Sequence, residues 1–401
     1  MKILFVEPEY QGHHVALHLN LLINEFYKRK WQINILTYKK SASSEAYKLI
    51  DKKIFNKIDF FYIKEISFYK TKNTFYLIYI QVIKYYNIIR SIKKILLKNH
   101  IDHIYFVTGD HIDKILAILG NFSLKVKFSL MLIYSKVYLN KNINYLNSFI
   151  LEVKKKLLFK LIDLLYLKNF FVLDLFLYKF IKKNKKKNFS KVTYTPDPGQ
   201  LKYLFSQKFS KDYLKIKKNF FLILIYGAIK MSKGIKELVS SLQYLNNNKI
   251  KLIIAGKQTD DVKFFLNLDV NKELINAGQV IVYDGFKNYK EEAILFSASD
   301  IVWVGYDNNF SGSSGVLHQA GIANKPVITN RLGLLGYLNK KYKIGTVVNP
   351  SSVIDIKNKI LYLYRNKKIR YMLGKNNNAL SKIHSGKNFA TTIANKISNV
   401  K

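Results

Sequence analysis

The chain has 401 residues, about twice the length of a typical domain, so two domains are the first expectation. Apolar residues make up 49% of it, which is enough to build packed cores. It contains no cysteine, which excludes disulfide bonds and metal sites built on thiolates.

The formal net charge of +41 raises the question of an anionic partner, either nucleic acid or an anionic membrane. Proteins that read base edges rely on arginine in a concentrated basic surface. Here arginine occurs five times against 62 lysines, and the charge is spread evenly along the chain. We therefore expect no nucleic-acid partner, and an AT-rich coding sequence accounts for the abundance of lysine.

The first part of the chain opens with the pattern strand, loop, helix, strand over residues 1–37. This is the usual beginning of a doubly wound α/β sheet. Further along, the apolar runs 103–110 and 125–135 predict strands, and the pattern of 75–100 predicts a helix.

The most apolar long segment covers residues 161–181, and four charged residues interrupt it, which argues against a transmembrane span. We expect a helix here. Its lysine-rich flanks leave two interpretations open: a core helix with a solvated lysine edge, or a helix on an anionic membrane surface. At the N-terminus a charge and a proline come too early for a signal peptide.

Beyond residue 218, strands and helices alternate regularly, which predicts a second doubly wound domain. The expected fold class is therefore α/β, with two tandem Rossmann-like domains facing a cleft. The expected domains are 1–200 and 201–385, followed by a C-terminal helix over 386–401 that could return to the first domain. The strands expected in the second domain cover 219–229, 249–256, 279–285, 300–306, 325–330 and 345–350, and the helices 234–246, 259–276, 289–299, 315–323, 353–366 and 367–382.

Two turns of the second domain have features of an anion site. The turn "YGAIKMSKGI" (226–235) places Lys233 and Gly234 just before a helix, where a lysine suits a diphosphate. The turn "FSGSSGVLHQA" (310–320) places small residues at a helix start, whose amides and dipole favour an anion. Taken alone, the second turn is equally consistent with an ordinary serine cap. The sequence has no P-loop, dinucleotide-binding or zinc-protease motif, and its histidines lack the spacing of a metal site.

The order of these segments resembles the donor domain of GT-B glycosyltransferases, in particular glycosyltransferase family 4, over roughly residues 219–365. The blocks that carry the resemblance are "GAIKMSKGI", "LIIAG", "VYDGF", "AILFSASDIVWVGY", "SGSSGVLHQAGIANKPVI", "LGLLG" and "GTVVNP". The resemblance implies a nucleoside-diphosphate sugar as the donor substrate, with no permanently bound cofactor and no metal.

The resemblance also implies the donor site. Lys233 would stabilise the diphosphate, although Ala228 stands where the family has arginine. The family's paired glutamates, spaced E-x7-E, align with Ser311 and Gln319, so neither carboxylate is present; Gln319 could still bond a ribose through its amide. Gly333 and Gly336 would lie in a loop facing the diphosphate. The donor-binding residues implied are Gly227, Lys233, Gly234, Gly285, Phe286, Ser311, Ser313, Ser314, Gly315, Val316 and Gln319.

The first domain would then bind the acceptor, a glycan or a lipid-linked sugar. Its strand-end loops contribute Gly12, His13, His14, Asp110 and His111. His14 or Asp110 would be the general base of an inverting enzyme. With Lys233, these two residues are the expected catalytic residues.

We therefore expect a metal-independent glycosyltransferase of the hexosyl type that builds a surface polysaccharide or glycolipid in the cytoplasm, at the membrane face. Two alternatives stay open. The residues Ala228, Ser311 and Gln319 would also suit a non-catalytic relative that binds sugar nucleotides or carbohydrate. A sugar-nucleotide epimerase fits less well, because the donor loop has lost its acids.

Overall fold

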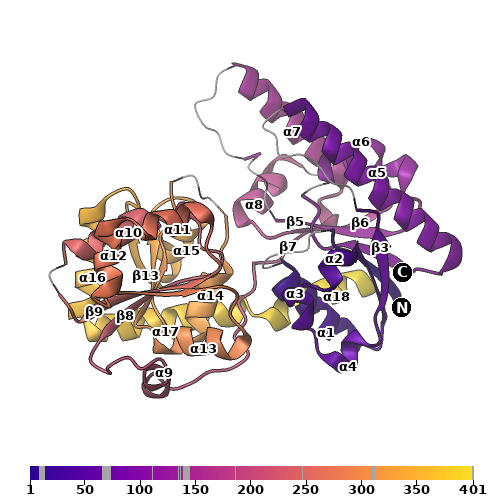
Figure 1. The fold of residues 1–401 in the computed structure, drawn as a ribbon. Coiled ribbons are helices and arrows are strands. Elements are labelled where there is room, and N and C mark those ends of the chain that lie inside the picture. The colour runs from indigo at the N-terminus through magenta and orange to yellow at the C-terminus, as the bar shows by residue number, and fades with distance from the viewer. Residues whose placement is uncertain are drawn as a thin grey trace. The chain divides into compact units, whose positions relative to one another are not determined.

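The structure of the chain, a computed structural model, describes residues 1–8, 14–65, 74–110, 112–133, 135, 137–138, 145–185, 187–245, 247–308, 310 and 312–399. It divides into two compact units (Figure 1). The first unit is Met1–Pro196 with Gly386–Lys401, and the second unit is Asp197–Ser385. The α/β fold expected from the sequence, with two parallel sheets, is confirmed.

The first unit is built on a parallel sheet, seven-stranded over the described residues, in the order β3-β2-β1-β4-β5-β6-β7. Its central strand β1 alternates between two cores. Leu4 and Val6 belong to one apolar cluster, and Ile3 and Phe5 belong to the other, so both faces are buried. The strands are β1 (Lys2–Val6), β2 (Gln32–Tyr38), β3 (Asp59–Ile63), β4 (His103–Phe106), β5 (Phe128–Leu132), β6 (Leu167–Val172) and β7 (Val192–Tyr194).

Helices cover the two faces of this sheet. The cluster with Leu4 takes in α5, α6, α7 and α8, and the cluster with Phe5 takes in α1, α3 and α18. The helices are a π-helix (His14–Leu19), α1 (Asn20–Lys28), α2 (Lys39–Ala42), α3 (Glu45–Lys48), α4 (Lys52–Phe55), α5 (Thr74–Lys98), α6 (Asp113–Ser123), α7 (Tyr145–Ile162), α8 (Leu175–Asn184), a 3-10 turn (Phe189–Lys191) and α18 (Gly386–Ser398).

The single helix expected over residues 161–181 is wrong. The segment contains the end of α7, the buried strand β6 and the start of α8, which Asp174 caps by accepting from the amides of Phe176 and Leu177. A strand buried on both faces of a parallel sheet is apolar throughout, so its pattern cannot be told from that of a buried helix. Within the described residues, no helix is both long and apolar enough to cross a membrane.

The C-terminal helix α18 packs into the first unit. Phe389, Ile393 and Ile397 are buried in the same cluster as Phe5, and Arg29, directly after α1, donates to Asn395 Oδ1 at 2.6 Å. At its start, a side chain at Gly386 would collide with Leu21, so the helix approaches α1 closely there. The chain therefore leaves the first unit after Pro196 and returns to it at Gly386.

The second unit contains a parallel sheet that, where described, has six strands in the order β10-β9-β8-β11-β12-β13. Its strands follow the predicted apolar runs closely. They are β8 (Phe221–Tyr226), β9 (Ile250–Gly256), β10 (Val280–Asp284), β11 (Ile301–Val304), β12 (Val327–Asn330) and β13 (Gly345–Val348). In this order β8 and β11 are neighbours at the centre although β9 and β10 lie between them in sequence, which is the switch point where doubly wound sheets bind ligands.

The helices of the second unit also follow the sequence prediction, with three exceptions. The single helix expected over 259–276 is two helices, α11 and α12. The expected loop around Gly333 and Gly336 is the first part of a helix, α15, and the region before residue 219 contains a short helix, α9. The helices are α9 (Gln207–Tyr213), a 3-10 turn (Met231–Lys233), α10 (Ile235–Gln243), α11 (Asp260–Leu266), α12 (Asp269–Asn276), α13 (Tyr289–Ala298), α14 (Gly315–Ile322), α15 (Gly333–Tyr342), α16 (Val353–Arg365) and α17 (Lys367–Ile383).

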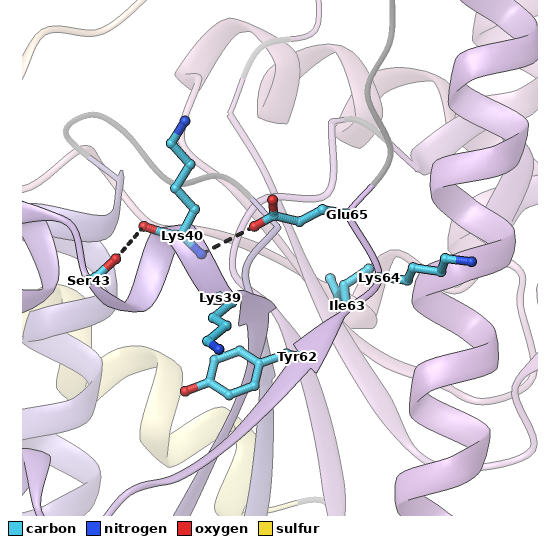
Figure 2. Close-up of a pocket in the computed structure, with 7 residues that line it drawn as sticks. All are labelled: Lys39, Lys40, Ser43, Tyr62, Ile63, Lys64 and Glu65. Carbon is cyan, nitrogen blue, oxygen red and sulfur yellow. Dashed lines mark hydrogen bonds between the residues drawn. The ribbon is translucent and has the colours of Figure 1, made fainter.

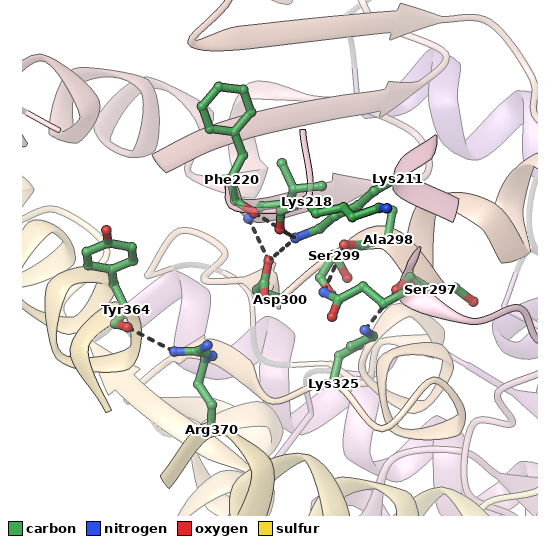
Figure 3. Close-up of polar contacts among 12 residues, drawn as sticks. Lys211, Lys218, Phe220, Ser297, Ala298, Ser299, Asp300, Lys325, Tyr364 and Arg370 are labelled. Atoms are coloured by element: carbon green, nitrogen blue, oxygen red, sulfur yellow. Dashed lines mark hydrogen bonds and ion pairs between the residues drawn. The ribbon is translucent and has the colours of Figure 1, made fainter. Parts of the chain in front are cut away.

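A polar cluster ties α9 to the amino-terminal edge of this sheet (Figure 3). Asp300, just before β11, accepts from the amide of Leu222 at 3.0 Å and pairs with the ammonium of Lys211 at 3.2 Å. Lys211 also donates to the carbonyl of Phe220 at 2.6 Å. The Lys211 and Asp300 side chains are 5% and 14% exposed, so each charge depends on the other to compensate for the loss of water.

We expect Asp300→Ala to lower the free energy of unfolding of the second unit by about 3 kcal/mol, because it leaves the buried ammonium of Lys211 without a counter-ion. The measurement is urea unfolding followed by tryptophan fluorescence in a Trp31→Phe background, where buried Trp303 is the only tryptophan. The control is Asp212→Ala. Asp212 and Lys218 form a surface pair at 3.9 Å, so the loss should stay under about 1 kcal/mol. Equal losses for the two variants would contradict the prediction.

Candidate functional site

The carboxyl-terminal end of β8 runs into a tight glycine turn. Gly227 follows the strand with φ +97°, and its carbonyl oxygen lies so close to Gly256, at the end of β9, that a Cβ there would stand 1.9 Å away. Gly256 itself has φ +131°, a conformation that side chains other than hydrogen rarely adopt. The two strand ends are therefore locked together, and the turn that carries Lys233 starts from a fixed point.

Lys233 bends back over this turn. Its ammonium donates to the carbonyl oxygen of Tyr226 and lies 5.4 Å from the centre of the Tyr306 ring. A Cβ built on Gly227 would stand 3.3 Å from Lys233 Nζ and 4.0 Å from Val316 Cγ2. Three predicted site residues, Gly227, Lys233 and Val316, are thus brought together at the centre of the sheet.

The Lys233 ammonium has no carboxylate partner in the described part of the chain. Burial, with the nearby charge of Lys230, lowers the pKa of Lys233 to about 8. A half-buried cation whose partners are a carbonyl oxygen and an aromatic ring is incompletely compensated for the water it has lost. An incoming anion would complete its coordination.

The backbone around Lys233 is fixed by a second close approach. The carbonyl oxygen of Lys233 accepts from the indole of Trp303 at 2.8 Å. Gly234 has φ +67°, and a Cβ there would lie 2.4 Å from the carbonyl oxygen of Gly305. Only glycine fits this position, so the predicted Lys233-Gly234 pair is set by packing against the end of β11.

The start of α14 is not capped by serine. Ser314 occupies the N-cap position, but its hydroxyl bonds the phenol of Tyr306 at 2.8 Å and makes no cap hydrogen bond. The neighbouring Ser313 donates to Asp197 Oδ2 at 3.1 Å. The ordinary serine cap is therefore ruled out for Ser314, and no side chain at the N-cap covers the positive end of the helix at Gly315 and Val316.

Gln319 lies on the same face of α14 as Val316, one turn further along. Its amide nitrogen donates to Glu292 Oε1 at 2.7 Å and to the carbonyl oxygen of Gln200 at 3.3 Å. Glu292 comes from α13 and also interacts with the phenol of Tyr226. Burial raises the pKa of Glu292 to about 7, while the hydrogen bonds from Tyr226 and Gln319 act in the opposite direction.

Gly285 and Phe286 follow β10 at the same edge of the sheet. Gly285 has φ +90° and open space where a side chain would stand, and Phe286 is 53% exposed. The turn is held by Asp284, whose carboxylate accepts from the amides of Gln258 and Gly285. An exposed aromatic ring on a fixed turn leaves this edge accessible.

Of the remaining predicted residues, two belong to the first unit and four lie outside the described residues. Asp110, after β4 of the first unit, accepts from the amide of Ile133 at 2.9 Å, so it holds the neighbouring strand end. His14 begins the π-helix, and only its backbone is described. Gly12, His13, His111 and Ser311 lie outside the described residues.

Sequence reasoning missed Glu292, Tyr226 and Tyr306. In the sequence, Tyr226 and Tyr306 stand at the ends of predicted apolar strands, and Glu292 is one of two acids in the first turn of α13. The neighbouring Glu291 does serve that local purpose, because it forms a capping box with Asn288. No local signal separates the two glutamates; only packing does.

A hollow of about 630 Å³ lies in the first unit, at the carboxyl ends of β2 and β3 (Figure 2). Its polar groups do not converge. The ammonium groups of Lys39, Lys40 and Lys64 point in different directions, and Glu65 accepts from the backbone amide of Lys40 at 3.2 Å. The hollow is lined by Lys39, Lys40, Ser43, Tyr62, Ile63, Lys64 and Glu65.

Residues 206–379, which include the whole glycine turn and α14, match the family model of the glycosyl transferases group 1. The match lies within the second unit. A search of curated proteins by sequence found no match. The matched residues include most of the segments on which the sequence resemblance was based.

Solved structures show that the whole chain has the GT-B fold. Sucrose-phosphate synthase from Thermosynechococcus elongatus matches with a TM-score of 0.76 at 13% identity, over 100% of this chain and 98% of that one. HepE of Anabaena, solved with UDP-glucose, matches at 0.70 and 14%, over 100% of both chains. WaaG, a glycosyltransferase involved in lipopolysaccharide biosynthesis, matches at 0.69 and 13%, over 99% of this chain and 100% of that one.

We expect the affinity for a nucleoside diphosphate such as UDP to fall as the pH rises above about 8, by up to tenfold per pH unit. The diphosphate has lost its last proton by pH 7.5, so the change comes from deprotonation of free Lys233. Calorimetric titration between pH 7 and 9.5 measures it. Lys233→Met should bind about tenfold or more weakly at pH 7 and show a flat profile.

Lys230→Met is the matched control, since Lys230 is an exposed lysine three residues away. It should keep the slope of the wild type, with the fall in affinity beginning at a somewhat higher pH, because the charge of Lys230 no longer lowers the pKa of Lys233. A slope that persists in Lys233→Met would assign the pH dependence to another group.

Proposed function

We propose that the protein is a glycosyltransferase that moves a hexose from a nucleoside-diphosphate sugar to a glycan or lipid-linked acceptor. The observation that carries the proposal is the half-buried Lys233, whose ammonium lacks a carboxylate partner in the described residues and lies beside the uncapped start of α14. The match of residues 206–379 to the family model of the glycosyl transferases group 1 supports it.

The leaving group of the proposed reaction is the nucleoside diphosphate, which gains negative charge as the bond to the sugar breaks. Lys233 and the amides of Ser314, Gly315 and Val316 would stabilise this charge from fixed positions. Such a site supplies the positive charge from the protein itself, so we propose transfer without a metal ion. Gly285 and Phe286 would flank the base of the nucleotide.

The acceptor would bind the first unit. Asp110 lies after β4 at the carboxyl end of that sheet, and His14 begins the π-helix. We keep both as candidates for the general base of an inverting reaction. HepE binds UDP-glucose and WaaG takes part in lipopolysaccharide biosynthesis, which supports a nucleotide sugar as donor and a surface polysaccharide or glycolipid as product.

The test is donor hydrolysis or transfer with a panel of UDP and GDP sugars. Lys233→Ala should lower kcat/KM by about 100-fold, because it removes a charge that acts on the leaving diphosphate. Lys230→Ala should stay near the wild type. A wild-type protein that binds no nucleotide would contradict the proposal, whereas tight binding with no turnover on any acceptor would favour the non-catalytic alternative, which the missing carboxylates at Ser311 and Gln319 suggest.

We further propose that the protein acts in the cytoplasm at the face of an anionic membrane, through the first unit. Helices α5, α6 and α7 pack side by side, with α6 in contact with both others (Figure 1). Large apolar side chains are exposed on all three: Ile78, Tyr79, Val82 and Tyr86; Ile118, Leu119 and Phe122; Phe149, Ile150 and Val153. We call these ten residues the α5–α7 surface.

Basic residues accompany this surface. Arg90, Lys93 and Lys94 are exposed in the second half of α5, and Lys154 and Lys156 follow Val153 on α7. Exposed apolar side chains next to lysines suit the boundary of an anionic bilayer, where the rings enter the acyl region and the ammonium groups meet phosphates. None of these ten residues lies in the segment 161–181, where sequence reasoning placed the membrane-facing helix.

We expect the double variant Phe122→Ser, Phe149→Ser to bind anionic vesicles about tenfold more weakly, because both rings lose their apolar burial. These rings are 81% and 63% exposed, so the fold should not depend on them. Sedimentation with phosphatidylglycerol vesicles measures the binding. The control is Phe264→Ser, a 72% exposed phenylalanine of the second unit. Unchanged binding of the double variant would contradict this assignment.

A further inference from the structure

We propose that Glu292 of α13 binds the ribose hydroxyls of the donor nucleotide, taking the place of an acid on α14. This inference rests on the proposed function. The residue that aligns with a ribose-binding glutamate is Gln319, and the structure places a carboxylate from another helix directly against it, at 2.7 Å.

The position of this pair follows from α14. Gly315 and Val316 lie at the helix start beside Lys233, and Gln319 is three residues beyond Val316. Residues three and four apart share a face of a helix, and three residues advance about 4.5 Å along its axis. Gln319 therefore lies within the length of a nucleoside diphosphate from the ammonium of Lys233, on the side of the helix that faces the turn.

The hydrogen bonds of Gln319 decide what it can offer a ligand. Both hydrogens of its amide nitrogen have acceptors, Glu292 Oε1 and the carbonyl oxygen of Gln200. Donation to a ribose oxygen would require breaking one of these bonds. The amide oxygen remains as an acceptor for a hydroxyl.

Glu292 can accept further hydrogen bonds. An ionised carboxylate accepts about four hydrogen bonds, and its described donors are the phenol of Tyr226 and the amide of Gln319. The residue is partly exposed. A ribose carries two neighbouring hydroxyls, and a carboxylate that accepts from both recognises the pair, as one that accepts a bidentate donor does.

Tyr226 connects this carboxylate to the diphosphate site. Its phenol interacts with Glu292, and its backbone carbonyl accepts from the ammonium of Lys233. One residue at the end of β8 therefore positions both charged groups, the anion for the hydroxyls and the cation for the phosphates. The hydrogen-bonded cap of α13 does not use this carboxylate, because Asn288 and Glu291 already form it.

The test compares UDP and GDP with their 2′-deoxy counterparts by calorimetry. The wild type should prefer the ribonucleotide by about tenfold, since a deoxy ligand leaves the carboxylate without one donor. Glu292→Gln should reduce this preference to about twofold or less while changing the affinity for the deoxynucleotide little. The variant keeps an acceptor for Gln319, so the fold should persist, and thermal unfolding checks it.

Glu291→Gln is the matched control, because glutamine can also complete a capping box. It should keep the full ribose preference. The exchange Glu292→Gln, Gln319→Glu returns a carboxylate to α14, and recovery of the preference would support a binding role over a structural one. A Glu292→Gln variant that keeps the wild-type preference would overturn the inference, as would a wild type that binds both ligands equally. A wild type that binds no ribonucleotide would contradict the proposed function itself.

Discussion

The ammonium group of Lys233 is the constraint around which the second unit is organised. A charge taken out of water is costly unless groups of opposite charge replace the water. Here a carbonyl oxygen and an aromatic ring replace only part of it, and the lowered pKa of Lys233 expresses the deficit. The glycine turn keeps the group in this position, because Gly256 packs against the carbonyl oxygen of Gly227, and Gly234 against that of Gly305, too closely for any side chain. The ammonium group therefore lacks a counter-charge that a bound anion would supply.

A comparison of lysines at the two edges of the same sheet shows how the partners of Lys233 differ from those of other lysines. At the amino-terminal edge, Lys211 is buried too, but Asp300 and the carbonyl oxygen of Phe220 satisfy it. Near that edge Lys325, whose pKa burial also lowers to about 8, donates to the carbonyl oxygen of Ser297 and lies in the field of Asp300. At the carboxyl-terminal edge, Lys233 has no carboxylate partner among the described residues. Lysine content says little in so basic a chain, and the proposed anion site is distinguished by a lysine that no carboxylate neutralises.

The sequence predicted what depends on local pattern. Most strands of the second unit are continuous apolar runs, and Gly234 after Lys233 marks a turn that a side chain would block. The same logic failed at residues 161–181, because strand β6 and the helices around it share one apolar composition. Glu292 could not be predicted, since a glutamate in the first turn of a helix is expected for local reasons and its partners, Tyr226 and Gln319, are 66 and 27 residues away in the chain.

The relation between Gln319 and Glu292 suggests how such a site can change its residues and keep its chemistry. A hydroxyl is recognised by an acceptor at a point in space, and the helix that supplies it matters little. Glutamine on α14 and glutamate on α13 place one carboxylate and one amide side by side, as the reverse arrangement would. A glutamine amide alone cannot replace the carboxylate. Its NH2 group would face groups that themselves donate hydrogen bonds to the carboxylate. If Glu292 binds the ribose as proposed, the glutamine at 319 and the acid at 292 act as a pair, and an alignment of sequences should compare the two positions together.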